Sequence, residues 1–213
     1  SQKGYVWARL PFLWGPMHQF WRVSVQQTRE RASTRQGGET AMCPRTQRLW
    51  LGQQWVEGAE AMSQANAQGA VVYTLARVPW PYRLDDARAW LGRAPQPGEA
   101  TLAVLAHEGA ARPRLIGVIG IHPEGDGHEF GYWLTPSAWG RGYATEAGRA
   151  MLGIARHAMG LRELRSSHFV DNPASARVLC KLGFRPSGEP VSRFCLASGD
   201  ERPSVPLAID LLA

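Results

Sequence analysis

The stretch that decides the fold is residues 131–147, which read GYWLTPSAWGRGYATEA. It begins as a β-strand, passes through a turn that contains Gly140 and Gly142, and then opens a helix. The first amides of a helix have no partner within it and lie at the positive end of the helix dipole, so they bind phosphate oxygens. Because glycine has no Cβ, Gly140 and Gly142 let the backbone approach a ligand closely. The stretch therefore predicts a phosphate-binding turn.

This turn differs from two other phosphate-binding motifs. It lacks the Gly-Lys-Ser/Thr ending of a Walker loop, and it lacks the early G-x-G-x-x-G with a later acidic residue that a dinucleotide fold needs. A second motif follows at residues 171–184, which read DNPASARVLCKLGF. The pair of motifs is far more specific than either motif alone.

With these two motifs the chain resembles the GCN5-related N-acetyltransferases (GNAT), and within them the RimJ/RimL-like branch, over roughly residues 46–212. The matching segments are GYWL at 131–134, WGRGYATEA at 139–147, NPAS at 172–175 and KLGF at 181–184. The resemblance implies a mixed α/β fold. Its central sheet has seven mostly antiparallel strands, is splayed between strands 4 and 5, and is flanked by helices. The turn has Trp139 where the wider family commonly has glutamine or arginine, and tryptophan is usual for this branch.

The resemblance also implies acetyl-CoA as the cofactor, with its pyrophosphate at the first motif. Asn172 is expected to hold a pantetheine amide through its two-sided hydrogen-bonding group, and the alternative is that it only caps a helix. The expected cofactor-binding residues are Leu134, Trp139, Gly140, Arg141, Gly142, Tyr143, Ala144, Thr145, Asn172 and Ser175.

Acetyl transfer to an amine requires a proton acceptor, because an alkylammonium has a pKa near 10. His128 and Glu129 lie at the start of the strand that leads into the turn, and strand alternation lets only one of them face the cleft. The branch often has a glutamate at the position of Glu129, so we expect Glu129 to be the base; the alternative is a place on the solvated face. Many relatives protonate the leaving sulfur with a tyrosine, and Leu179 stands at that position here. Ser175 resembles the hydroxyl that this branch aims at the thioester sulfur, so the resemblance implies that Ser175 is the donor to the sulfur. The alternative is a serine that bonds its own backbone.

The acceptor amine is expected to meet aromatic rings. Trp80 and Tyr82 lie in the loop where this fold forms the acceptor cleft, and flat amphipathic rings suit a peptide or an apolar amine. Simple packing is the alternative for both. No metal site is expected, and the histidines that lack metal spacing and a nucleophile partner are interpreted as structural or surface residues: His18, His107, His122 and His157.

The charge is unevenly placed along the chain. The net charge is +6, and residues 1–45 carry seven basic and two acidic side chains. We therefore expect a basic N-terminal extension or linker at 1–45 and the acetyltransferase domain at 46–213. Nucleic-acid binding is not expected, except for a ribosome contact through the basic extension. A poorly ordered arm is the alternative.

Composition also bears on the setting. The three cysteines are odd in number and lack metal-ligand spacing, which fits a reducing compartment. The sequence has no apolar run of about 18 residues, so no membrane span is expected. We expect a cytoplasmic protein that is a monomer or a homodimer.

Hydrophobic patterns and turn residues predict the elements. Gly183 is expected to end the last helix, and Asp85 is expected to cap the second. The expected strands are 46–51, 101–106, 115–121, 128–134, 164–170, 194–196 and 205–212. The expected helices are 56–67, a second one that begins after residue 85 and runs through 91, 144–158 and 173–182.

The function that these features predict is transfer of acetyl from acetyl-CoA to a primary amine. By branch resemblance the first acceptor to consider is a protein N-terminal α-amine, of the kind found on ribosomal proteins. The alternatives are a small-molecule amine such as a polyamine or an antibiotic, a non-catalytic acyl-CoA-binding module, and a nucleic-acid-associated protein whose basic arm docks on RNA.

Overall fold

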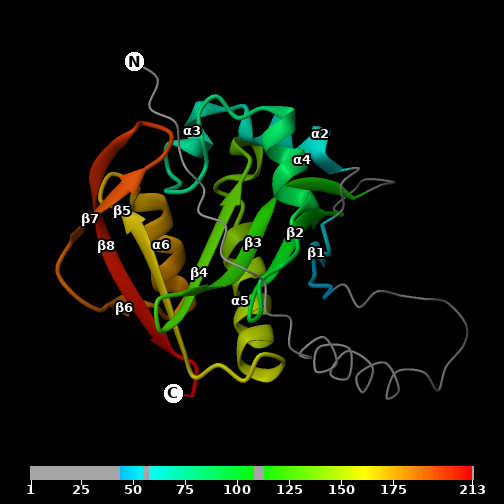
Figure 1. The fold of residues 1–213 in the computed structure, drawn as a ribbon. Coiled ribbons are helices and arrows are strands. Elements are labelled where there is room, and N and C mark those ends of the chain that lie inside the picture. Colours follow the sequence, from blue (N-terminus) through cyan, green and yellow to red (C-terminus); the bar gives the residue numbers. More distant parts are fainter. Residues whose placement is uncertain (1–43, 55–57, 108–112, 213) are drawn as a thin grey trace, which may run out of the picture. The chain divides into compact units, whose positions relative to one another are not determined.

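The computed structural model describes residues 44–54, 58–107 and 113–212 (Figure 1). The prediction of a basic extension falls mainly on residues 1–43, which lie outside this part. Residues 42–213 form one compact unit. No helix in the described part is long and apolar enough to cross a membrane.

One sheet organises the described residues. Its strands follow the order β1-β2-β3-β4-β5-β8-β6, and β7 also pairs with β8. The strands are β1 (Leu49–Gly52), β2 (Ala100–Ala106), β3 (Arg114–Glu124), β4 (Gly127–Leu134), β5 (Glu163–Phe169), β6 (Arg185–Pro186), β7 (Val191–Cys195) and β8 (Asp200–Asp210). The helices are α2 (Ala59–Asn66), α3 (Gly69–Val72), α4 (Leu84–Gly92), α5 (Tyr143–His157) and α6 (Pro173–Leu182), with a short 3-10 turn at Pro136–Ala138.

The predicted fold class is confirmed. All strand pairs are antiparallel except β4–β5, which is parallel and joined at the pair Glu129↔Arg165. The splay expected between the fourth and fifth strands therefore lies where it was predicted. The sheet has eight strands instead of seven, because the two-residue β6 pairs with β8. A strand of two residues has no alternation to detect in a sequence.

The helices cover the two faces of the sheet separately. On one face, α5 and α6 pack on a core that includes Ile119, Phe130 and Met151. On the other face, α2 and α4 pack on Val118. Figure 1 shows α5 and α6 behind the strands, and α2, α3 and α4 together near one end of the sheet.

Helix ends explain two local outcomes. Gly183 has φ 99° at the end of α6, a left-handed conformation that glycine adopts without strain, so its predicted role is confirmed. The prediction that Asp85 caps the second helix is wrong. The cap residue of α4 is Arg83, whose backbone N–H donates to Asp86 at 2.7 Å. Either aspartate is a helix-start residue by type, so the sequence alone does not separate them.

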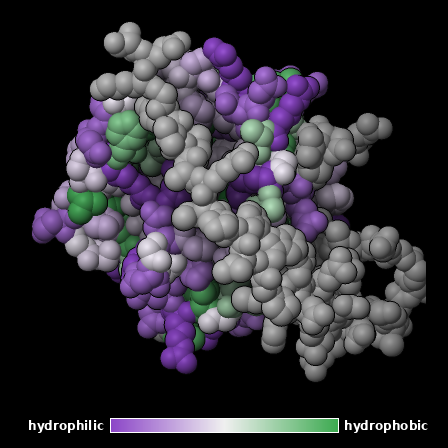
Figure 2. Space-filling model, in the orientation of Figure 1, coloured by the Kyte–Doolittle hydropathy of each residue, from purple (hydrophilic) through white to green (hydrophobic). Residues whose placement is uncertain are grey.

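The described surface in the view of Figure 2 is mostly hydrophilic, with small and separate hydrophobic patches. The large hydrophobic side chains that remain exposed include Trp80, Trp139 and Phe194. Scattered exposed apolar residues are normal on a folded protein, so the surface by itself marks no docking face.

Candidate active site

The start of α5 is built to receive an anion. Gly142 is the cap residue with φ 80°, and Gly140 has φ 72°. Both values are in the left-handed region that favours glycine. The turn thus enters a helix of 15 residues, whose first-turn amides have no carbonyl partner within the helix. A Cβ added at Gly140 would meet no atom within 4 Å, so the backbone there lies open to a ligand.

Side chains before β1 brace this turn from behind. Glu146, in the first turn of α5, accepts hydrogen bonds from Thr46 Oγ1 at 2.6 Å and from Arg48 Nε at 2.7 Å. Arg48 also donates to the carbonyl of Arg141 at 3.0 Å. Burial alone would raise the pKa of Glu146, but the bonds from Thr46 and Arg48 lower it, so the carboxylate stays ionised. These bonds hold the turn and the first turn of α5 together.

A cleft of about 1210 Å³ connects this turn with the gap between β4 and β5. Arg141 does not line it; its guanidinium lies 4.9 Å from the ring centre of Tyr143. The other predicted cofactor-binding residues all line the cleft: Leu134, Trp139, Gly140, Gly142, Tyr143, Ala144, Thr145, Asn172 and Ser175. The structure therefore brings together two motifs that are separate in the chain, at 131–147 and 171–184.

The start of α6 presents a pair of hydroxyl groups to the cleft. Asn172 caps α6, because its Oδ1 accepts the backbone N–H of Ser175 at 3.1 Å. The capping alternative for Asn172 is thus realised, and its amide nitrogen is the group left for the predicted pantetheine contact. Tyr132 on β4 donates its hydroxyl hydrogen to Ser175 Oγ at 3.2 Å. Tyr132 was not among the predicted site residues.

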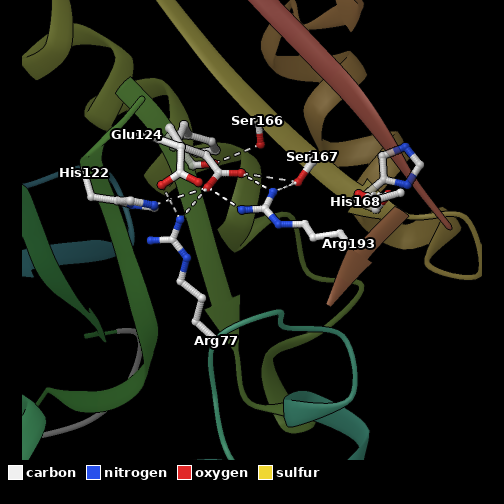
Figure 3. Close-up of polar contacts among 10 residues, drawn as sticks. Arg77, His122, Glu124, Ser166, Ser167, His168 and Arg193 are labelled. Carbon is white, nitrogen blue, oxygen red and sulfur yellow. Dashed lines mark hydrogen bonds and ion pairs between the residues drawn. The ribbon is translucent and has the colours of Figure 1, made fainter. Parts of the chain in front are cut away.

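A charged cluster forms the other end of the cleft (Figure 3). Arg193 on β7 binds both oxygens of Glu129 on β4, at 2.5 and 2.7 Å. His122 on β3 lies 3.2 Å from Glu129 Oε2, and Ser167 on β5 donates to Oε1 at 3.3 Å. Arg77 lies 3.4 Å from the same carboxylate. Side chains from three other strands and a loop therefore contact the carboxylate of Glu129, which is only 12% exposed.

Glu129, not His128, faces the cleft. Glu129 lines the cleft. His128 lies on the opposite side, next to Gly98: a Cβ added at Gly98 would be 3.0 Å from His128 Nε2. Burial alone would raise the pKa of Glu129, but the bonds from His122 and Arg193 outweigh it and hold the pKa well below its usual range. A carboxylate so strongly held in its ionised form is a weak proton acceptor. Both oxygens of Glu129 are already bound by Arg193, and His122 lies beside Oε2, so these contacts favour an orienting role over that of the direct base.

His122, interpreted from the sequence as a structural or surface residue, lines the cleft beside Glu129. His122, Glu124 and Glu129 could offer ligand atoms within 4.8 Å of one another to a cation. Arg77 and Arg193 already supply positive charge to these carboxylates, so the cluster is an ion-pair network. Repulsion from the two guanidinium groups weighs against a metal ion here.

The structure places the two predicted acceptor residues, Trp80 and Tyr82, differently with respect to the cleft. Tyr82 lines the cleft, and burial together with the charge of Asp86 raises the pKa of Tyr82 to about 12. Trp80 is 41% exposed and does not line the cleft; its ring lies 5.9 Å from that of Tyr73. Of the two rings, only Tyr82 is placed to meet a substrate in this cleft.

Comparison with known proteins agrees with this geometry. Residues 48–185 match the family described as acetyltransferase (GNAT) domain. A stretch of 77 residues is 38% identical to an uncharacterized N-acetyltransferase, YoaA, of Bacillus subtilis (strain 168). That match covers 35% of this chain and 44% of YoaA, so the chain spans under half of the length of this relative.

Solved structures share the fold. A GNAT-family acetyltransferase from Bacillus anthracis superposes with a TM-score of 0.69 at 21% identity, over 81% of this chain and 100% of that one. Spermidine N-acetyltransferase from Vibrio cholerae, in complex with CoA and spermine, gives 0.67 at 16% identity, over 79% and 100%. Ribosomal-protein-S5-alanine acetyltransferase from Vibrio fischeri gives 0.66 at 12% identity, over 79% and 96%. At these identities the likeness establishes the fold alone. The family match spans more than half of the chain, so this protein belongs to the acetyltransferase (GNAT) domain family, whose cofactor is acetyl-CoA.

Proposed function

We propose that the protein transfers the acetyl group of acetyl-CoA to a primary amine, and that this amine is the N-terminal α-amine of a protein. The observation that carries the proposal is one cleft that joins a phosphate-binding helix start to a buried charged cluster. Its two ends offer what direct transfer needs, which is a fixed position for the acetyl donor and groups that move a proton.

The residues at the helix start fit acetyl-CoA. Gly140 leaves its backbone open, and Ala144 and Thr145 lie in the first turn of α5 and line the cleft. These amides would hold the diphosphate, while Leu134 and the free amide nitrogen of Asn172 would contact the pantetheine arm. Bound acetyl-CoA would supply the acetyl group as an activated thioester.

The proton transfers are assigned to the chain's own groups. The amine proton goes to the Glu129–His122 pair, in which the carboxylate orients the imidazole, the ring that proteins use most often as a general base. Water can carry the proton between the amine and the pair. Bound acetyl-CoA would supply the acetyl carbon for the new C–N bond, and its sulfur would leave with the electron pair of the C–S bond. Ser175 donates a hydrogen bond to this developing charge.

The charge of the cleft bears on the acceptor. Among the described residues, four acidic side chains line it, and three of them are paired with arginine: Glu99 with Arg93, Glu129 with Arg193, and Asp171 with Arg202. The fourth, Asp86, accepts the backbone N–H of Arg83. A polyamine carries several positive charges and needs carboxylates that are not already neutralised. A peptide terminus presents a single amine, and it therefore suits this cleft better.

A steady-state assay with three acceptors tests the proposal. We expect acetylation of a peptide with a free N-terminus, none of the same peptide with a blocked N-terminus, and slower turnover of a polyamine. Turnover of the polyamine without turnover of the free peptide would reject the acceptor. Absence of turnover on every amine, with acetyl-CoA binding intact by calorimetry, would reject the enzyme in favour of a non-catalytic acyl-CoA-binding module.

A further inference from the structure

Two hydroxyl groups meet inside the cleft, and the chemistry above uses only one of them. Tyr132 lies on β4, three residues past the single β4–β5 pair at Glu129, and Ser175 lies in the first turn of α6. Their hydrogen bond of 3.2 Å therefore crosses the region where the two strands separate. Both residues line the cleft.

We propose that Tyr132 is a positioning residue for Ser175, whose hydroxyl hydrogen it turns toward the sulfur of the acetyl donor. The proposal rests on the proposed function, in which Ser175 is the donor to that sulfur. A hydroxyl group has one hydrogen to donate and two lone pairs that accept. Because Tyr132 supplies the hydrogen that Ser175 accepts, the hydrogen of Ser175 remains available for a third group.

The surroundings of Ser175 show why it needs a partner. A serine in the first turn of a helix can turn its hydroxyl to its own backbone, which withdraws the donor from the cleft. The cap from Asn172 fixes the backbone of Ser175 but leaves the side-chain torsion free. The bond from Tyr132 restrains that torsion. The Tyr132–Ser175 pair thus places a donor where a backbone cap alone would not.

The direction of this bond is stable across pH. Burial raises the pKa of Tyr132, and the opposing effect of the bond to Ser175 is smaller. The phenol therefore keeps its proton at neutral and mildly alkaline pH, and Tyr132 remains the donor. This also makes Tyr132 a poor acid in its own right, which agrees with an action through Ser175.

A double-mutant cycle on turnover tests the proposal. We expect Tyr132→Phe to lower kcat about tenfold, the effect of one hydrogen bond, with the Kd of acetyl-CoA unchanged within about twofold. Ser175→Ala is expected to lower kcat further, and adding Tyr132→Phe to it is expected to change nothing more. Tyr73→Phe, which removes a hydroxyl outside the cleft, and Ser198→Ala, on an exposed turn, are the matched controls.

A second readout does not depend on turnover. The ultraviolet absorbance of the thiolate reports the pKa of the thiol of CoA bound to each variant. We expect Ser175→Ala to raise this thiol pKa, Tyr132→Phe to raise it less, and the double variant to match Ser175→Ala. Ser175→Thr, which restores a hydroxyl, is expected to recover part of both effects. Thermal melts of each variant verify that it is folded.

The outcomes separate the two levels of the account. Unchanged kcat and thiol pKa in Tyr132→Phe, while the wild type binds and turns over, would overturn the positioning role alone. If the effects of Tyr132→Phe and Ser175→Ala on kcat were fully additive in the double variant, Tyr132 would act independently of Ser175. That result would also overturn the positioning role. A wild type that neither binds CoA nor turns over would overturn the proposed function together with this inference.

Discussion

The two ends of the cleft differ in what forms them: backbone groups form one end, and charged side chains form the other. The end at α5 is made of backbone, with left-handed Gly140 and Gly142 and first-turn amides that come from a single stretch of chain. The end at Glu129 is made of side chains that come from four strands and a loop. The first end recognises charge through main-chain geometry, and the second arranges charge through ion pairs.

This difference teaches which part of the site can change in evolution or by design. A backbone cradle requires particular residues only where the conformation excludes a side chain, so its specificity is for a group common to all reactions with one cofactor. A side-chain cluster changes with every substitution. We therefore expect the α5 end to govern cofactor binding and the Glu129 end to govern turnover and the acceptor.

The largest effect is expected from Gly142→Val. A β-branched residue at φ 80° is strained, so the turn must shift and its amides lose their alignment. We expect acetyl-CoA affinity to fall about 100-fold, the loss of two or so charge-assisted hydrogen bonds, as measured by calorimetry. Gly153→Ala is the control, because Gly153 lies in the interior of α5 with no atom within 4 Å of an added Cβ. Equal affinity in Gly142→Val and wild type would break the distinction between the two ends.

The next effect is expected from Glu129→Gln. The amide retains the shape but loses the charge that orients His122 and pairs with Arg193. We expect kcat to fall about 30-fold, within the range for general acid–base groups, while the Kd of acetyl-CoA stays unchanged. Glu163→Gln, on the exposed start of β5, serves as the control. A loss of cofactor affinity in Glu129→Gln with normal kcat would reverse the assignment of the two ends.

The ion pair at Glu129 also predicts a pH dependence of stability. The folded pKa of Glu129 lies below the value of about 4.3 in an unfolded chain, so the pair stabilises the fold above pH 4.3 and loses this contribution as the pH falls. We expect the free energy of unfolding, measured with urea, to fall between pH 6 and pH 3 in both proteins. The fall is expected to be about 1–2 kcal/mol smaller in Glu129→Gln than in wild type. Equal drops in both proteins would show that the pair does not form in solution.

The smallest effect distinguishes the two aromatic residues. Tyr82→Ala is expected to raise the acceptor KM about fivefold, because Tyr82 lines the cleft and offers a ring to the acceptor. Trp80→Ala is expected to change it by less than about twofold, since Trp80 lies outside the cleft. Steady-state kinetics at saturating acetyl-CoA give both values. A larger effect of Trp80→Ala would place the acceptor on the outer surface beside Tyr73.

The same contrast explains what the sequence could predict. The turn at Gly140 and Gly142 and the cap at Asn172 depend on residues that are near one another in the chain, so their spacing was readable. The splay between strands was implied by the family resemblance. The cluster at Glu129 was not readable, because Arg193 is 64 residues away, Arg77 is 52 and Ser167 is 38.

Local ambiguity accounts for the remaining differences. His128 and Glu129 are neighbours on one strand, and only the sheet decides which of them faces the cleft. Trp80 and Tyr82 share a loop, where no periodicity assigns a direction. Tyr132 and Ser175 are 43 residues apart, and only the folded arrangement of β4 and α6 brings their hydroxyl groups together.

The most direct test follows the backbone amides of the domain by NMR while acetyl-CoA is added. The account predicts saturable binding, with the largest shifts at the amides of residues 140–145 and smaller ones at Asn172 and Ser175. An absence of binding, or binding that leaves the amides of 140–145 unchanged, would contradict the claim that the start of α5 holds the cofactor.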